Sequence, residues 1–192
     1  MKITNNKQHE IAVREINDRI KAINDYLGKG DETKLSEPYL IRIPSGYIRT
    51  ADEFRAMLGT RITSPLKTNA AYHLILSDLY SLLLNRYNVW GPLREMIIKS
   101  QLVNIAAICE SILVTLSSKN GGYVKRVQKL LELGVICEEC AKSLEWLWTR
   151  RQGIHLFELD KIEYAQYDDS DFDKALHTLK LLIHDTNVVQ AN

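Results

Sequence analysis

Residues 101–117 of the chain read QLVNIAAICESILVTLS, and this stretch decides the fold. Its apolar residues recur every three or four positions, which is the spacing of one face of an α-helix. They are Leu102, Ile105, Ala106, Cys109, Ile112, Leu113 and Leu116. Because an apolar face of this length has to be buried, the stretch predicts a helix in the interior of a folded body.

The sequence on both sides of this stretch is also typical of helices. Apolar residues at helical spacing predict helices at about 65–87, 124–134, 140–148 and 172–183. Ser64 and Pro65 resemble an N-cap followed by proline at the first helical position. Ser170 and Asp173 resemble a capping box. We therefore expect an all-α fold, in which residues 65–192 form an antiparallel helical bundle.

Residues 1–64 are expected to form an N-terminal part that packs on this body. A helix is predicted at about 9–27, with Ile16, Ile20, Ile23 and Leu27 at helical spacing. Residues 39–49 are rich in β-prone types around Pro44 and Ser45, so they predict a small hairpin or an extended arm. Thr50 and Glu53 form a capping box for a short helix that ends near Leu58.

The composition limits the function classes that fit the chain. It has 192 residues, of which 45% are hydrophobic and 26% are charged, as in ordinary globular domains. Its 25 Lys and Arg residues balance 24 Asp and Glu residues, so any contact with RNA has to be local. Residues 1–6 lack the apolar core of a signal peptide, and we expect no apolar run of the length of a membrane span. We expect a cytoplasmic protein that makes no membrane contact.

The three cysteines predict neither a disulfide framework nor a metal site. Cys137 and Cys140 form a Cys-x-x-Cys pair, but a structural zinc site needs four ligands and the sequence has no second such pair. A redox role for the pair needs a βαβ context, which a helical pattern does not provide. We expect Cys137 to pack near a turn, and Cys140 and Cys109 to lie on apolar helix faces. No metal and no cofactor is predicted.

The residues that point to chemistry are Arg150 and His155, which follow the predicted helix at 140–148. Arginine is a permanent planar cation that matches phosphate, and histidine transfers protons near neutral pH. RNA supplies its own nucleophile, the 2′-hydroxyl, so these two groups suffice to cut it without a metal. Residues five apart lie about 140° apart around an unbroken helix, so the pair converges more easily if the helix breaks near Gly153. The alternative interpretation is a surface arginine beside a histidine with a structural partner.

The run from Leu144 to Leu156, LEWLWTRRQGIHL, resembles the signature of HEPN domains (higher eukaryote and prokaryote nucleotide-binding). In that family an arginine, four to six residues and a histidine join the end of one core helix to the start of the next. The resemblance covers about Thr68 to Asp185. It implies a HEPN-like bundle and a metal-independent endoribonuclease. The sequence departs from the family at Arg151, where Asn, Asp or His often follows the first arginine.

The resemblance also implies an arrangement of the site. In the family the motifs of two subunits commonly face each other across a homodimer cleft. Arg150 and His155 would be the catalytic residues, Arg151 and Gln152 would bind the RNA backbone, and Glu110 would support His155. The reaction would be attack of the 2′-hydroxyl on the adjacent phosphorus. Such proteins often act as toxins or defence effectors and pair with an antitoxin, commonly a small nucleotidyltransferase.

Several alternatives stay open beside this hypothesis. A non-catalytic module of the same fold, used for RNA or nucleotide binding or for assembly, fits the balanced charge and Arg151. Glu110 also fits a surface position or a pairing with a core arginine. The run 168–171 fits negative charge at a helix N-terminus, and Trp148 fits packing better than base stacking. Three histidines have no partner that the sequence reveals: His73, His177 and His184.

Overall fold

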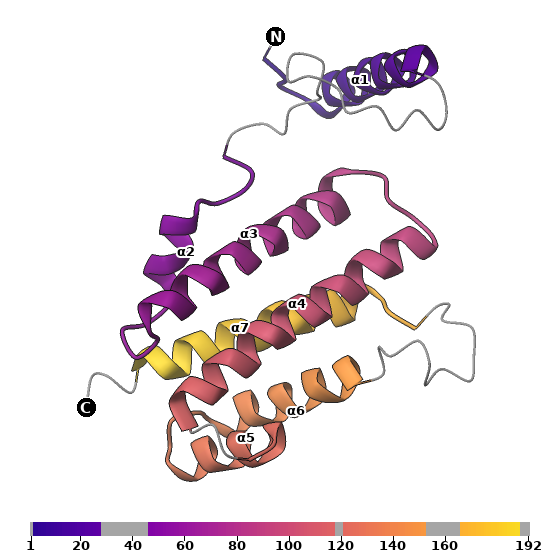
Figure 1. The fold of residues 1–192 in the computed structure, drawn as a ribbon. Coiled ribbons are helices and arrows are strands. Elements are labelled where there is room, and N and C mark those ends of the chain that lie inside the picture. The colour runs from indigo at the N-terminus through magenta and orange to yellow at the C-terminus, as the bar shows by residue number, and fades with distance from the viewer. Residues whose placement is uncertain (1, 28–45, 118–120, 153–165, 189–192) are drawn as a thin grey trace. The chain divides into compact units, whose positions relative to one another are not determined.

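The computed structural model describes residues 2–27, 46–117, 121–152 and 166–188 (Figure 1). All regular secondary structure within these ranges is helical, which confirms the all-α prediction. The helices are α1 Asn6–Leu27, α2 Ala51–Met57, α3 Ser64–Arg86, α4 Pro92–Ser117, α5 Tyr123–Glu132, α6 Glu138–Gln152 and α7 Asp169–Val188. The chain divides into two units, Met1–Ile43 and Pro44–Asn192. The first contains α1, and the second contains the other six helices.

The second unit is built around α4, the helix predicted from residues 101–117. α4 contacts α3, α5, α6 and α7, and α6 in turn contacts both α5 and α7. In Figure 1, α3 and α4 run side by side in opposite directions and α7 lies along α4. The buried residues of α4 are Ile98, Lys99, Gln101, Leu102, Asn104, Ile105, Ala106, Ile108, Cys109, Ile112 and Leu113. These residues point in several directions around the helix, as a helix enclosed by four others requires.

The apolar character of α4 corrects one expectation. By length and composition this helix is long and apolar enough to cross a membrane, although we expected no such segment. Over half of that apolar window, 56%, is buried inside the structure. A core helix meets the same criteria as a membrane span when it is apolar around most of its circumference. The contacts with four neighbouring helices account for the composition of α4.

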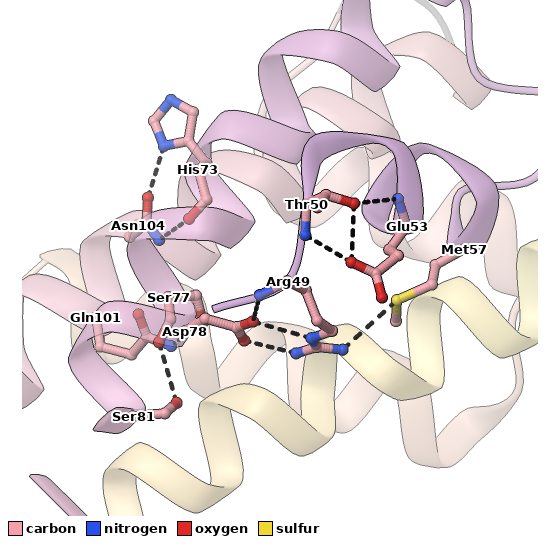
Figure 2. Close-up of polar contacts among 10 residues, drawn as sticks. All are labelled: Arg49, Thr50, Glu53, Met57, His73, Ser77, Asp78, Ser81, Gln101 and Asn104. Atoms are coloured by element: carbon pink, nitrogen blue, oxygen red, sulfur yellow. Dashed lines mark hydrogen bonds and ion pairs between the residues drawn. The ribbon is translucent and has the colours of Figure 1, made fainter. Parts of the chain in front are cut away.

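The short helix α2 belongs to the same unit as the bundle, whereas we grouped it with residues 1–64. The predicted capping box is confirmed: the Thr50 hydroxyl accepts the backbone N–H of Glu53, and the Glu53 carboxylate accepts that of Thr50 at 2.7 Å. Arg49 donates to both carboxylate oxygens of Asp78 on α3, at 2.9 and 2.6 Å (Figure 2). Phe54 is 1% exposed beneath the Arg49 guanidinium. These contacts attach α2 to α3.

Polar side chains also join α3 to α4. The Nδ1 atom of His73 lies 2.6 Å from Oδ1 of Asn104, and the Asn104 amide donates to the His73 carbonyl at 2.8 Å (Figure 2). One turn away, the buried Gln101 amide donates to the Ser77 hydroxyl at 2.5 Å. Each bond crosses between the two helices, so together they set the register of α3 against α4.

The ends of the elements differ from prediction in three places. α3 begins at Ser64, so Thr63 and not Ser64 is its N-cap. α7 begins at Asp169, and Asp168 is its N-cap. The Asp168 carboxylate precedes the helix and accepts a free N–H group of the first turn, whereas Ser170 lies within that turn. Of the predicted hairpin or arm, Gly46 to Ile48 form a turn with no strand, and 39–45 lie outside the described residues.

Candidate functional site

Arg150 lies in the last turn of α6, and the packing of that helix fixes its direction. The buried residues of α6 are Cys140, Ala141, Leu144 and Leu147. Arg150 comes three residues after Leu147, so it lies at the edge of the buried face. Its side chain is 32% exposed and meets the start of α7. The guanidinium is therefore neither free in solvent nor fully enclosed.

The Arg150 guanidinium has three partners at the start of α7. It forms a bidentate ion pair with Asp171, in which Nε donates to Oδ1 at 3.1 Å and Nη2 donates to Oδ2. Nη2 also donates to the Gln166 carbonyl at 2.6 Å, and the guanidinium carbon lies 5.0 Å from the centre of the Tyr167 ring. None of the hydrogen bonds to described residues uses Nη1. The arrangement fixes the plane of the guanidinium.

Asp171 is at the same time part of the cap of α7. The Asp168 carboxylate accepts the Asp171 N–H at 3.1 Å and the Ser170 hydroxyl at 2.6 Å, while Asp171 accepts the Asp168 N–H at 3.3 Å. The bond from the Ser170 hydroxyl, followed by the backbone bond from Asp171, holds the pKa of Asp168 below its usual value. The run 168–171 therefore supplies negative charge to a helix N-terminus, as its sequence suggested.

Two arginines from different helices pair with this acidic run. Arg94, in the first turn of α4, donates to Asp169 at 3.1 and 2.6 Å. Arg150 of α6 forms an ion pair with Asp171, two residues after Asp169. Within the described ranges no three His, Cys, Asp or Glu residues group so as to hold a metal ion. Two of the three carboxylates of the run are thus paired with arginine side chains.

An acidic residue of α4 that reaches this region is Glu95, which the sequence did not mark. The expected partner of Glu110, His155, lies outside the described residues. The Glu95 carboxylate accepts the Gln166 N–H at 3.3 Å, next to the carbonyl that binds Arg150. Glu110 lies about 22 Å further along the helix axis, at 1.5 Å per residue. Its charge acts on the buried phenol of Tyr123, whose pKa is raised by burial and by nearby charges. Between described residues, no contact links Glu110 to Arg150.

The two predicted RNA-binding residues differ in their surroundings. Arg151 lies over the Trp148 ring, with its guanidinium carbon 5.2 Å from the ring centre. Trp148 is stacked on Tyr123, with the ring centres 4.4 Å apart and the planes 9° from parallel. Trp148 is therefore occupied by packing contacts, as expected. Gln152 is exposed at the end of α6.

The histidines complete the account of the predicted residues. His155 and Gly153 lie outside the described residues. The sequence revealed no partner for three other histidines, but each has one: His73 pairs with Asn104, His177 lies 3.5 Å from Glu139, and His184 lies 3.3 Å from Asp185. The contacts of His177 and His184 are exposed, and that of His73 is the α3–α4 bond of Figure 2.

The cysteines have structural roles in the described part of the chain. Cys137 precedes α6 and accepts the Cys140 N–H on its Sγ atom at 3.4 Å, while its own N–H binds Asp185 at 2.8 Å. Cys140 and Cys109 are buried. Burial raises the pKa of the Cys109 thiol to about 12 and raises that of Cys140 as well. Both buried groups are therefore protonated thiols at neutral pH.

Several residues of this region were missed by sequence reasoning. Four residues surround Arg150 or its partners: Glu95, Gln166, Tyr167 and Asp171. Of these, only Asp171 stood in a run that the sequence had marked.

No protein-family model, no curated protein and no solved structure matches the chain. The chemistry of the region is that of a fixed, partly exposed guanidinium at the end of a helix.

Proposed function

We propose that this protein is a metal-independent endoribonuclease of the HEPN type, in which Arg150 binds the scissile phosphate and His155 transfers a proton. The observation that carries the proposal is the position of Arg150. Its guanidinium is held at the end of α6, five residues before His155 in the sequence, and the side chain remains 32% exposed. The resemblance of residues 144–156 to the HEPN signature supports the same function.

The contacts of Arg150 suit a group that binds a phosphate. Asp171 and Gln166 engage Nε and Nη2, so the orientation of the guanidinium is set before a ligand arrives. A donor that needs no reorganisation stabilises developing charge better than a mobile one does. Nη1 is the nitrogen proposed to donate to a non-bridging phosphate oxygen. Arg151 and the exposed Gln152 are proposed to contact the neighbouring RNA backbone.

The proposed reaction is a transesterification. The 2′-oxygen of one nucleotide attacks the adjacent phosphorus, the bond from phosphorus to the 5′-oxygen breaks, and the products are a 2′,3′-cyclic phosphate and a 5′-hydroxyl. One His155 takes the proton of the 2′-hydroxyl, and His155 of a second copy gives a proton to the leaving 5′-oxygen. A well-placed acid or base contributes roughly 10²–10⁴-fold in rate. Arg150 stabilises the negative charge that grows on the phosphate oxygens.

The proposal includes the surroundings in which such an enzyme acts. The substrate is cellular RNA in the cytoplasm, and the active form is a homodimer whose motifs face each other. Uncontrolled cleavage of RNA harms the cell that makes the enzyme. We therefore propose that an inhibitory partner binds this protein. Its type would be the nucleotidyltransferase that commonly accompanies HEPN toxins.

The test is cleavage of a mixed RNA pool in EDTA. Wild type, His155→Ala, Arg150→Lys and the control Arg86→Lys, at an exposed position of α3, are compared at equal concentration. We expect cyclic-phosphate ends with wild type and the control. We expect the rate of RNA cleavage to fall at least 100-fold with His155→Ala. It should also fall clearly with Arg150→Lys, because lysine cannot keep the bidentate ion pair with Asp171 and also reach a phosphate. Cutting by His155→Ala at the wild-type rate, or no cutting by folded wild type, would overturn the proposal.

A second candidate function is a non-catalytic module of the same fold that binds RNA or a protein partner. The observation that favours it is the degree to which Arg150 is already satisfied by Asp171, Gln166 and Tyr167. An arginine with these contacts joins α6 to α7 whether or not it meets a ligand. This candidate predicts that RNA binds without being cut and that His155→Ala changes neither binding nor stability.

A further inference from the structure

The Cys-x-x-Cys pair lies at the start of α6, and contacts on both sides fix its position. Cys137 directly precedes the helix, and its carbonyl accepts the Ala141 N–H at 3.0 Å, which closes the first turn. The residue before it, Ile136, is 3% exposed, and its N–H bonds to the Leu130 carbonyl at 3.4 Å. The Cys137 N–H bonds to the Asp185 carboxylate of α7 at 2.8 Å. The chain therefore enters α6 along a path that α5, α6 and α7 determine together.

The sulfur of Cys137 lies over the first turn of this helix. Its Sγ atom accepts the backbone N–H of Cys140 at 3.4 Å. The Cα atoms of residues three apart at the start of a helix lie about 5 Å from each other. A disulfide requires a Cα separation of roughly 4.4–6.8 Å. The backbone therefore already holds the two cysteines at a separation that a disulfide spans.

The two thiols differ in their access to solvent. Cys137 is exposed, whereas Cys140 is 0% exposed. Burial, followed by the charges of Asp185 and Cys137, raises the pKa of the Cys140 thiol, so both of these groups lie near it. An oxidant in solution thus reaches Cys137 first and finds Cys140 behind it. An accessible cysteine next to a second cysteine that resolves its adduct is the arrangement of redox-sensing pairs.

We infer that Cys137 and Cys140 form a reversible redox pair, and that its co-reactant is a small disulfide such as oxidised glutathione. From the sequence we expected a redox role to need a βαβ unit. The feature of such a unit that acts on the cysteine is the start of a helix, and α6 provides it within an all-helical bundle. Free N–H groups at a helix start stabilise a thiolate, which is the form of cysteine that attacks disulfides.

The proposed reaction is thiol–disulfide exchange in two steps. The Cys137 thiolate attacks one sulfur of oxidised glutathione, the S–S bond of glutathione breaks, and one glutathione leaves as a thiolate. The Cys140 sulfur then attacks Sγ of Cys137, and the second glutathione leaves with the proton of the Cys140 thiol. Two cysteine thiols are oxidised to one disulfide, and one glutathione disulfide is reduced to two thiols.

Acidic neighbours limit how fast this pair reacts. Glu138 and Glu139 separate the two cysteines, and the Asp185 carboxylate lies beside them. Negative charge disfavours a thiolate, so these groups oppose the effect of the helix start. We therefore expect exchange over minutes to hours, as in uncatalysed disulfide rearrangement, and not the speed of a redox enzyme. The pair suits a response to a lasting change in redox conditions.

The test exposes the reduced full chain to excess oxidised glutathione, traps the free thiols by alkylation and identifies the products by mass. The variants are Cys137→Ser, Cys140→Ala and the control Cys109→Ala, which removes another buried thiol. Serine at position 137 keeps a side-chain acceptor at the start of α6. We expect wild type and Cys109→Ala to form a disulfide between positions 137 and 140 that dithiothreitol reverses. Cys140→Ala should stop at the glutathione adduct of Cys137, and Cys137→Ser should react at least tenfold more slowly.

Three results would overturn the inference. Wild type whose two cysteines remain thiols shows that the pair does not react, and wild type that keeps a stable glutathione adduct on Cys137 shows that Cys140 does not resolve it. Reaction of Cys137→Ser at the wild-type rate places the reactive sulfur elsewhere. Far-UV circular dichroism checks that each variant stays folded. None of these results depends on RNA cleavage, so failure of the redox pair and failure of the proposed nuclease can be told apart.

Discussion

At the scale of single residues, the pairing of Arg150 with Asp171 connects stability with the proposed chemistry. Asp171 accepts two bonds from Arg150 and also caps α7, and its side chain is only 11% exposed. A carboxylate in this position keeps the arginine oriented and neutralises part of its charge. Arg150 thus joins α6 to α7 while its side chain remains 32% exposed.

This pairing predicts a large difference between two aspartates of the same helix. Asp171→Ala should lower the free energy of unfolding by about 1–3 kcal/mol, because Arg150 loses a charged partner and α7 loses part of its cap. Asp173→Ala, at an exposed position of the same helix, should change it by about 0.5 kcal/mol or less. Urea denaturation of both variants measures the two values. Equal effects would show that the Arg150 ion pair contributes little to stability.

At the scale of elements, the junction between the end of α7 and the start of α6 depends on Asp185. Its carboxylate accepts the Cys137 N–H at 2.8 Å, just before α6 begins. Burial of Asp185 raises its pKa, but the hydrogen bonds from Cys137 and from His184 outweigh burial and lower the pKa overall. A carboxyl group with a lowered pKa stabilises the fold in its charged form.

The lowered pKa of Asp185 sets the pH range in which this contribution is lost. It is complete above the unfolded pKa of about 3.9, and it disappears as the pH falls through the lower folded value. Asp185→Asn should therefore be less stable than wild type at pH 6, by roughly 1 kcal/mol, and the difference should shrink as the pH falls below about 4. Denaturation curves between pH 2.5 and 6 measure this, with Asp173→Asn as the control. A difference that stays constant over this range would contradict the assignment.

At the scale of the whole molecule, the division of the chain decides which part folds alone. α2 contributes Phe54 to the core of the bundle, and Leu58 and Ile62 after it are also buried. The unit that begins at Pro44 includes all three, whereas a body that begins at residue 65 omits them. The core of the bundle therefore extends across the boundary that the sequence suggested.

Two shortened chains test this division. Residues 44–192 should unfold in one cooperative transition, with a free energy of unfolding close to that of the full chain. Residues 65–192 should lose several kcal/mol, because each of the three missing side chains is worth about 1.5–3 kcal/mol when buried. Thermal and urea unfolding of both chains give the comparison. Equal stability of the two would mean that α2 is only loosely attached.

Apolar periodicity and capping are local properties of neighbouring residues. They therefore predicted the helical fold class, the burial of α4 and the approximate extent of the helices in the described part of the chain. The sequence marked Arg150, but not the residues around it. The packing of the helices brings Asp171, Gln166 and Tyr167 to the guanidinium, brings Glu95 to Gln166, and attaches α2 to the bundle. Each of those contacts joins residues at least 16 positions apart in the chain or on separate helices, so it depends on how the helices pack and not on any local pattern.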